Sequence, residues 1–189
     1  IQNVQANYAL LAKALGFDPD CLVLSNQVHG NTIREVTARD AQGLDHRDYP
    51  ECDGLITNTP GVGLVVFTAD CTPVLLHDPV TGAVGAVHAG WKGTAQDICG
   101  HAVQAMQKTY GCRPENIRAA IGPNISQCCF ETDEDVPQAM LKTYGNAVTD
   151  SIASHGNKYY VNLKTINAYA LQRAGVQNID ISDHCTACM

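Results

Sequence analysis

The chain has 189 residues, of which 45% are hydrophobic and 16% are charged, and its formal net charge is −7. This composition is typical of a globular protein with a full core and excludes a disordered chain. The negative charge argues against binding along a nucleic-acid backbone, which needs clustered Lys and Arg. No apolar run approaches the ~20 residues that span a membrane, so we expect neither a nucleic acid nor a membrane as a partner.

In chain order, the spacing of apolar residues first predicts a helix over residues 2–15 that ends at Gly16. Strands are then expected in the segments CLVLSNQVHG (21–30), TIREV (32–36), DGLIT (53–57), GLVVFTA (63–69), PVLLHD (73–78), GAVGAVHAG (82–90) and IRAAIG (117–122). Turn residues at 78–82 separate two of these strands, so residues 63–88 are predicted to form a buried hairpin.

The rest of the chain carries helical patterns. A capping box at Thr94–Asp97 predicts the start of a helix that ends at Gly111. Two more helices are predicted over about residues 132–144 and over 162–174. Hairpin-like strands interleaved with helices indicate a mixed α/β layered fold rather than a doubly wound parallel sheet. We expect residues 1–189 to form a single domain.

The cysteine content bears on the cellular compartment. The chain has 9 cysteines at irregular spacing. A secreted disulfide framework is typical of small domains, whereas a chain of this length buries a core without such crosslinks. We therefore expect a reducing compartment and a cytoplasmic location.

Three potential metal ligands lie where apolar segments end. His29 closes NQVHG, Cys71 follows VVFTAD, and His88 follows GAVGAV. Zinc binds thiolate sulfur and imidazole nitrogen, and catalytic zinc sites typically combine three protein ligands with one open position. If the three segments meet at one place, these residues form such a site. The alternative is a buried cysteine and two satisfied histidines, and the spacing alone leaves both interpretations open.

The segment AGWKGT directly follows His88. Its glycines, Gly90 and Gly93, expose backbone N–H groups near the start of a helix, and Lys92 adds positive charge. Such an arrangement favours a bound anion, so these three residues are candidates for substrate binding through a phosphate. The alternative is an ordinary glycine turn with a solvated lysine.

Two further groups are open to more than one interpretation. Asp70 adjoins Cys71 and either orients a ligand, acts as a catalytic acid or base, or caps the turn. Cys185 and Cys188 form a CxxC pattern that fits a metal knuckle or a redox pair, but no second CxxC completes a four-cysteine site. We favour a structural role for this pair, and we expect the adjacent Cys128–Cys129 to pack in the core.

Several segments resemble one known family in the same order along the chain. They are QVHG, DGLIT, TADCTPVLL, AVHAGWKGT, IGPNISQCCFE and a late CT, and they run from residue 27 to residue 186. On these segments the chain resembles the laccase-domain family of purine nucleoside phosphorylases, formerly called multicopper polyphenol oxidoreductases and also described as peptidoglycan editing factors. Because that family begins earlier and continues into an arginine-containing tail, we expect this sequence to be truncated at both ends.

The resemblance implies a layered α/β/β/α fold similar to that of bacterial cysteine-hydrolase toxins. It implies that His29, Cys71 and His88 are the active residues and bind zinc, with copper as a possible occupant. The implied activity is phosphorolysis of adenosine, inosine and methylthioadenosine, with adenosine deamination at the same site. A purine nucleoside and phosphate are therefore the expected partners.

Other functions fit parts of the sequence. The chain has 7 histidines and no His-x-His pair, fewer imidazoles than the four-copper centre of a laccase uses. Copper nevertheless suits a site of two imidazoles and a thiolate, so weak polyphenol oxidation is one alternative. A metal-free hydrolase that edits peptidoglycan precursors, with Cys71 as nucleophile and His88 as base, is another. The third alternative is a binding module without catalytic activity. We predict the zinc-dependent purine nucleoside phosphorylase.

Overall fold

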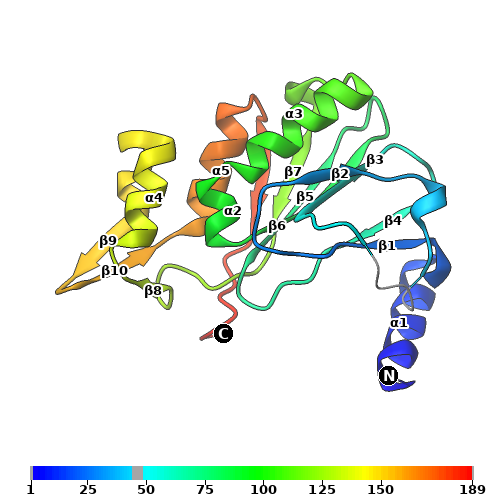
Figure 1. Ribbon diagram of the computed structural model, residues 1–189, viewed down its shortest axis with the longest axis horizontal. Helices are drawn as coiled ribbons and strands as arrows, with labels where there is room; N and C mark the ends of the chain where they lie inside the picture. The colour runs from blue at the N-terminus through cyan, green and yellow to red at the C-terminus, as the bar shows by residue number, and fades with distance from the viewer. Residues whose placement is uncertain (1, 44–48, 189) are drawn as a thin grey trace.

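The computed structural model describes residues 2–43 and 49–188 (Figure 1). Its strands are β1 (Leu22–Leu24), β2 (Ile33–Glu35), β3 (Gly54–Thr57), β4 (Gly63–Val65), β5 (Thr72–His77), β6 (Val84–Ala89), β7 (Arg118–Ile121), β8 (Glu131–Thr132), β9 (Ile152–His155), β10 (Lys158–Val161) and β11 (Asn178–Ile181). Its α-helices are α1 (Gln2–Leu15), α2 (Trp91–Ala95), α3 (Ile98–Tyr110), α4 (Asp135–Tyr144) and α5 (Leu163–Arg173). Short 3-10 helices lie at Pro19–Cys21, Ala38–Asp40, Pro114–Asn116 and Gly145–Ser151.

A mixed six-stranded sheet forms the centre, with the strand order β11-β7-β5-β6-β3-β2. The inner neighbours pair antiparallel, whereas the outer pairs β2–β3 and β7–β11 are parallel. In the β5–β6 hairpin, Thr72 lies opposite Ala89 and Pro73 lies opposite His88. The start of β5 and the end of β6 are therefore side by side.

Helices α3 and α5 cover one face of this sheet (Figure 1). Ile98 and Met106 of α3 are fully buried in one apolar cluster with Ile56 of β3. Because successive side chains of a strand point to opposite faces, the neighbouring Leu55 belongs to a different cluster on the other face.

The other face carries the second layer of strands. There Leu55 packs with the residues of β1, which pairs in parallel with β4. Tyr8 of α1 and Phe17 pack against the same cluster. The layers therefore run from helices through the central sheet and the β1–β4 pair to α1, and the predicted mixed α/β layered fold is confirmed.

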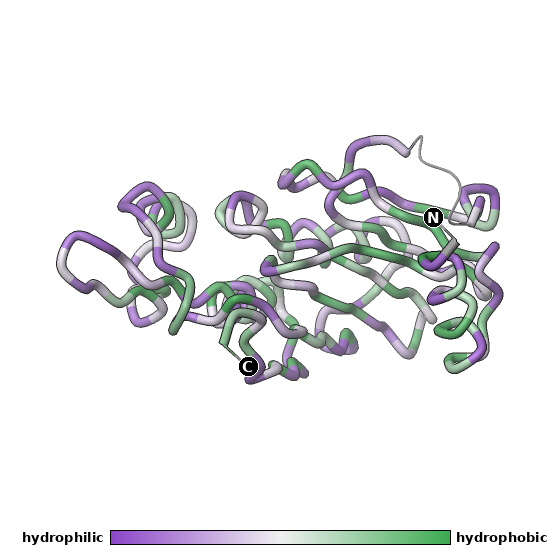
Figure 2. The backbone as a smooth tube through the Cα atoms, turned by 90° about the horizontal axis from the view of Figure 1, so that it is seen from below, coloured by the Kyte–Doolittle hydropathy of each residue, from purple (hydrophilic) through white to green (hydrophobic). Residues whose placement is uncertain are grey.

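A smaller sheet, β8-β10-β9, extends the molecule at one end, and α4 lies beside it (Figure 1). Figure 2 shows hydrophobic residues concentrated along the strands of the central sheet, whereas the tip of the β9–β10 hairpin is hydrophilic. Among the described residues, no helix combines the length and the apolar character needed to cross a membrane.

Two predicted elements differ from the structure. The hairpin consists of β5 and β6 alone, because Gly63–Val65 leaves the central sheet to pair with β1. The helix predicted from Thr94 is divided into α2 and α3 by Asp97, whose backbone is left-handed with φ of 60°. Thr94 caps nothing, because its buried hydroxyl is hydrogen-bonded to Asn167 of α5.

The first helix is present as predicted, but its apolar face is not fully buried. Ala12 is buried, whereas Leu11 is 47% exposed and Leu15 is 69% exposed. The strands β8–β11 were not among the predicted elements, because their segments are short and mostly exposed or half-exposed, so they carry little apolar pattern.

Candidate metal centre

The structure brings His29, Cys71 and His88 together. One ligand atom from each lies within 4.8 Å of the other two, and His29 Nε2 is 3.8 Å from Cys71 Sγ. The two imidazole rings meet edge to face, with their centroids 4.9 Å apart. The three side chains therefore face one point, as a shared metal ion requires.

The β5–β6 hairpin places two of the three side chains. Cys71 directly precedes β5. His88 is the residue before the last one of β6 and pairs with Pro73 of β5. The antiparallel pairing therefore sets Cys71 beside His88, although they are 17 positions apart in the sequence. The prediction that each group ends a strand is wrong in detail, since Cys71 comes before its strand and His88 lies within its own.

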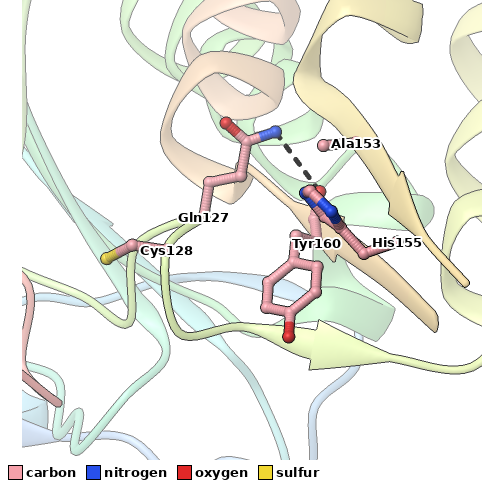
Figure 3. Close-up of a pocket in the computed structure, with 5 residues that line it drawn as sticks. All are labelled: Gln127, Cys128, Ala153, His155 and Tyr160. Atoms are coloured by element: carbon pink, nitrogen blue, oxygen red, sulfur yellow. Dashed lines mark hydrogen bonds between the residues drawn. The ribbon is translucent and has the colours of Figure 1, made fainter.

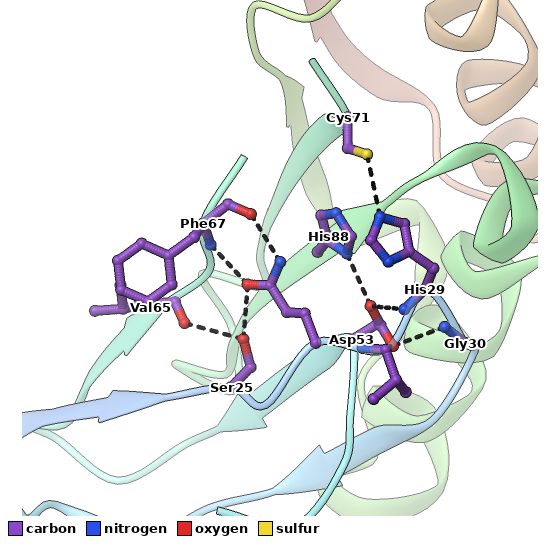
Figure 4. A network of polar contacts seen from close by, with 10 residues as sticks. Ser25, His29, Gly30, Asp53, Val65, Phe67, Cys71 and His88 are labelled. Atoms are coloured by element: carbon purple, nitrogen blue, oxygen red, sulfur yellow. Dashed lines mark hydrogen bonds and ion pairs between the residues drawn. The ribbon is translucent and has the colours of Figure 1, made fainter. Parts of the chain in front are cut away.

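Asp53, directly before β3, holds the third ligand in place. His29 has a left-handed backbone with φ of 60°, which is unusual for a residue other than glycine. The fully buried carboxylate of Asp53 accepts hydrogen bonds from the backbone N–H groups of Val28, His29 and Gly30, at 3.2, 2.9 and 2.8 Å (Figure 4). These bonds stabilise the turn that presents the His29 ring to Cys71.

Asp53 also orients His88. Its Oδ1 lies 2.8 Å from His88 Nδ1, so the imidazole donates that N–H to the carboxylate and leaves Nε2 free to bind a metal (Figure 4). A carboxylate behind a ligating histidine fixes the tautomer and the ring orientation and makes the nitrogen more basic. One buried carboxylate thus positions two of the three ligands.

A second network holds the chain segment that leads to His29. The Gln27 side chain accepts a hydrogen bond from the backbone N–H of Phe67 and donates one to its carbonyl oxygen, both at 2.7 Å. Ser25 Oγ lies 3.0 Å from Gln27 Oε1 (Figure 4). The segment after β1 is thereby tied to the one after β4, close to the ligands.

The glycines after His88 allow close approach. A Cβ at Gly90 would lie 2.8 Å from His29 Cδ2 and 3.2 Å from Cys71 Sγ. A Cβ at Gly93 would lie 2.7 Å from the backbone oxygen of Gly30. Gly90 thus borders the ligand cluster, Gly93 packs against the His29 turn, and substrate contact by either residue stays a prediction.

The chemistry of the donor set fits a metal ion. Two imidazoles and one thiol are ligands that zinc and copper both accept, and three protein ligands leave a position open for water or substrate. Burial raises the pKa of the Cys71 thiol, and the charges of Asp70 and Asp53 raise it further. A cation at this point would therefore be needed to keep the sulfur ionised at neutral pH.

The other predicted site residues lie around this cluster. Asp70 is exposed, and its Oδ1 accepts a hydrogen bond of 2.7 Å from the Thr186 hydroxyl. Lys92 is exposed, with its Nζ 5.6 Å above the Trp91 ring, and it lines a hollow that Lys142 of α4 also lines. The phosphate role of Lys92 and the acid–base role of Asp70 stay predictions.

A separate hollow lies outside this cluster. It measures about 640 Å³ and is lined by Gln127, Cys128, Ala153, His155 and Tyr160 (Figure 3). The rings of His155 and Tyr160 meet edge to face there. No member of the His29–Cys71–His88 cluster lines this hollow, so the hollow and the candidate metal ligands are at different places.

The role of Asp53 and the position of Cys128 and Cys129 were not predicted from the sequence. Asp53 was not singled out, although it stands directly before the apolar segment GLIT, at the kind of strand boundary that suggested the three ligands. Cys128 and Cys129 do not pack in the core as predicted. They are exposed and half-exposed, and their sulfurs lie within 4.8 Å of those of Cys185 and Cys188.

A family model described as multi-copper polyphenol oxidoreductase laccase matches residues 1–189. A purine nucleoside phosphorylase from Deinococcus radiodurans is 40% identical over 183 residues, which cover 97% of this chain and 68% of the relative. An enzyme named adenosine deaminase RL5, from an unknown prokaryotic organism, is 35% identical over 185 residues, covering 94% of this chain and 70% of its own length.

The solved structures include one with the same fold along nearly the whole chain. The crystal structure of the Bacillus licheniformis hypothetical protein YfiH superposes with a TM-score of 0.93 at 34% identity. The match covers 99% of this chain and 72% of that one.

Proposed function

This chain belongs to the multi-copper polyphenol oxidoreductase laccase family, and we propose that it is a zinc-dependent purine nucleoside phosphorylase that also deaminates adenosine. The observation that carries the proposal is the convergence of His29, Cys71 and His88, with Asp53 behind His88. The relatives named purine nucleoside phosphorylase and adenosine deaminase support the substrate class.

His29, Cys71 and His88 would hold the ion and leave one position open toward solvent. When bound there, zinc would supply Lewis-acid chemistry for substrate polarisation or for activation of water. Asp53 would keep the His88 ring in the ligating orientation throughout the reaction, because its carboxylate is fixed by backbone N–H groups. The half-exposed Cys71 and exposed His29 would leave the ion reachable by a substrate.

In phosphorolysis, a phosphate oxygen forms a bond to C1′ of the ribose while the bond from C1′ to the purine nitrogen breaks. The purine leaves with a proton, and ribose 1-phosphate is the other product. Lys92 and the backbone around Gly90 are the candidate phosphate contacts, since Gly90 borders the ligands. Asp70, next to Cys71, is the candidate proton donor or acceptor.

Deamination of adenosine is a second activity that the same cluster would support. The oxygen of an activated water bonds to C6 of the purine, the C6–N bond breaks, and ammonia leaves with inosine as the other product. This reaction needs no phosphate, so the two reactions are separable by omitting phosphate from the assay.

A metal-free cysteine hydrolase would use the same groups. The Asp53 contact on His88 Nδ1 leaves Nε2 free to act as a base, and His29 Nε2 lies 3.8 Å from Cys71 Sγ, within hydrogen-bond distance of a sulfur. The state of the thiol argues against this alternative. The raised pKa of Cys71 disfavours the free thiolate. Copper in the same donor set is separated from zinc by metal analysis of protein expressed without added copper.

The test incubates the zinc-loaded chain with inosine and phosphate and measures hypoxanthine and ribose 1-phosphate. Adenosine without phosphate is assayed separately for inosine. We expect both activities in the wild type and neither in His29→Ala, whereas His77→Ala, on the same hairpin but at its far end, retains both. Zinc-loaded wild type that forms no hypoxanthine and no inosine would contradict the proposal.

A further inference from the structure

Outside the His29–Cys71–His88 cluster, the structure gathers four cysteines. The Sγ atoms of Cys128, Cys129, Cys185 and Cys188 all lie within 4.8 Å of one another. The first pair follows β7 and the second pair follows β11, and these two strands are parallel neighbours. A bridge between Asn124 and Cys185 continues that pairing past the sheet, so both segments leave the sheet together.

We propose that these four cysteines bind a structural zinc ion. Four thiolates fill the tetrahedral coordination that zinc prefers and leave no open position. Sulfurs about 2.3 Å from a central zinc are about 3.8 Å from one another. Cys128 Sγ lies 3.6 Å from both Cys129 Sγ and Cys188 Sγ, close to that edge length.

A disulfide is the competing interpretation of any pair in the cluster. It joins two sulfurs about 2.05 Å apart and leaves the other two cysteines unexplained. Adjacent cysteines such as Cys128 and Cys129 bridge each other only with strain, because their Cα atoms are about 3.8 Å apart across a trans peptide. A single ion accounts for all four sulfurs at once.

A buried charge beside the cluster supports an anionic zinc site. Lys164 of α5 is only 5% exposed, and its Nζ donates to Ser126 Oγ at 3.0 Å and to the His184 carbonyl oxygen at 2.7 Å. None of the ion pairs among the described residues involves Lys164. A buried ammonium group is costly without a counter-charge, and zinc with four thiolates carries a net charge of about −2.

Backbone groups already orient one ligand. The N–H of Ser126 donates to Cys185 Sγ at 3.3 Å, and Cys185 is buried. The Ser126 carbonyl oxygen accepts hydrogen bonds from the N–H groups of Cys129 and Phe130, at 2.9 and 3.0 Å. Ser126 thus ties both cysteine pairs into one turn. Cys128 lines the neighbouring hollow, but in Figure 3 its sulfur points away from His155 and Tyr160.

The cluster is connected to the first site through Thr186, which lies within the CxxC segment. Its hydroxyl donates to Asp70 Oδ1 at 2.7 Å, and its backbone N–H donates to the Asn124 carbonyl oxygen at 3.0 Å. The N–H of Ile125 donates to the Asp70 carbonyl oxygen at 2.9 Å. A zinc ion here would therefore fix both segments that flank Asp70, the neighbour of Cys71.

The experiment isolates this site by using the His88→Ala chain, in which the first site has lost a ligand. After purification with zinc and reductant, native mass spectrometry should find one zinc ion per chain. X-ray absorption should find four sulfur ligands at about 2.3 Å. Adding Cys188→Ser or, independently, Cys128→Ser should weaken zinc binding at least tenfold. Cys21→Ser, a half-buried cysteine outside both clusters, should leave it unchanged.

Three results would overturn the proposal. They are His88→Ala protein that carries no zinc, zinc ligated by nitrogen rather than by four sulfurs, or a disulfide between cysteines of this cluster in protein kept under reductant. Since the readout is metal content and ligand type, it is independent of whether the chain acts on nucleosides.

Discussion

The two clusters of metal-ligating side chains are built differently. His29, Cys71 and His88 offer a mixed donor set of three. A buried carboxylate holds His29 and His88, and the β5–β6 pairing sets Cys71 beside His88. The four cysteines offer sulfur alone, from two segments beyond the ends of strands. Three ligands with an open position suit catalysis, whereas four identical ligands that close the coordination sphere suit a crosslink.

The difference extends to what holds each cluster without an ion. Asp53 fixes the first cluster through four hydrogen bonds, so its geometry belongs to the folded protein. At the second cluster, Cys128 and Cys188 are exposed, and their sulfurs lie 3.6 Å apart. Removing the metal from the first cluster should therefore abolish activity. Removing it from the second cluster should lower the stability of the folded chain.

The largest expected effect is that of Cys71→Ser. A serine hydroxyl is a much poorer zinc ligand than a thiolate, so the first cluster should lose its metal. Phosphorolysis of inosine should fall by more than about 100-fold, because even partners behind the ligands are worth about 10- to 100-fold. The zinc content should fall by one ion per chain while the unfolding temperature changes little. A large drop in unfolding temperature would show that the first cluster, too, serves as a crosslink.

Asp53→Asn should have the second-largest effect, a loss of metal affinity at the first cluster. The amide accepts fewer of the backbone hydrogen bonds and faces the His88 ring with an amino group or a weaker acceptor. Metal affinity at the first cluster, measured by chelator competition, should fall by about 10- to 100-fold. Asp78→Asn is the matched control, because Asp78 is equally buried but lies at the other end of the hairpin. Equal loss of metal affinity in both variants would remove the positioning role of Asp53.

Gly90→Ala should have a smaller effect. The added Cβ would press on His29 and Cys71 from 2.8 and 3.2 Å, so the ligands must shift by a few tenths of an ångström. A misplacement of about 1 Å costs about 100-fold, and we therefore expect about a tenfold loss of kcat/KM. Gly85→Ala, in the strand β6 that leads to Gly90, meets its nearest side-chain atom at 3.4 Å and should cost little activity. Unchanged kcat/KM in Gly90→Ala would mean that the ligands are not crowded at this point.

Much of this arrangement was predictable from local patterns. Alternating apolar segments predicted the strands that place Cys71 and His88, and the glycine turns predicted where several helices end. The resemblance in ordered motifs named the family, which the match over residues 1–189 confirms. These features depend on neighbours in the sequence, so a single sequence carries them.

What could not be predicted depends on tertiary contacts. Thr94 and Asp97 have the spacing of a capping box, but Asn167 engages the Thr94 hydroxyl and Arg173 pairs with Asp97 from α5. The cysteine cluster joins segments that only the parallel pairing of β7 and β11 brings together. The role of Asp53 likewise appears only when the turn at His29 folds onto it.

The smallest expected effect tests the connection between the two clusters. Thr186→Val keeps the shape of the side chain but removes its hydrogen bond to Asp70, and Thr186→Ser restores the hydroxyl. Because both groups are exposed, we expect a loss of about 1 kcal/mol at most, which is a drop of about 2–4 °C in unfolding temperature for a chain of this size. If the four-cysteine site positions Asp70 through this bond, Thr186→Val should also lower kcat/KM severalfold while leaving two zinc ions per chain, and Thr186→Ser should recover it. A fall in unfolding temperature with unchanged kcat/KM would make the bond purely structural, and the two clusters would then act independently.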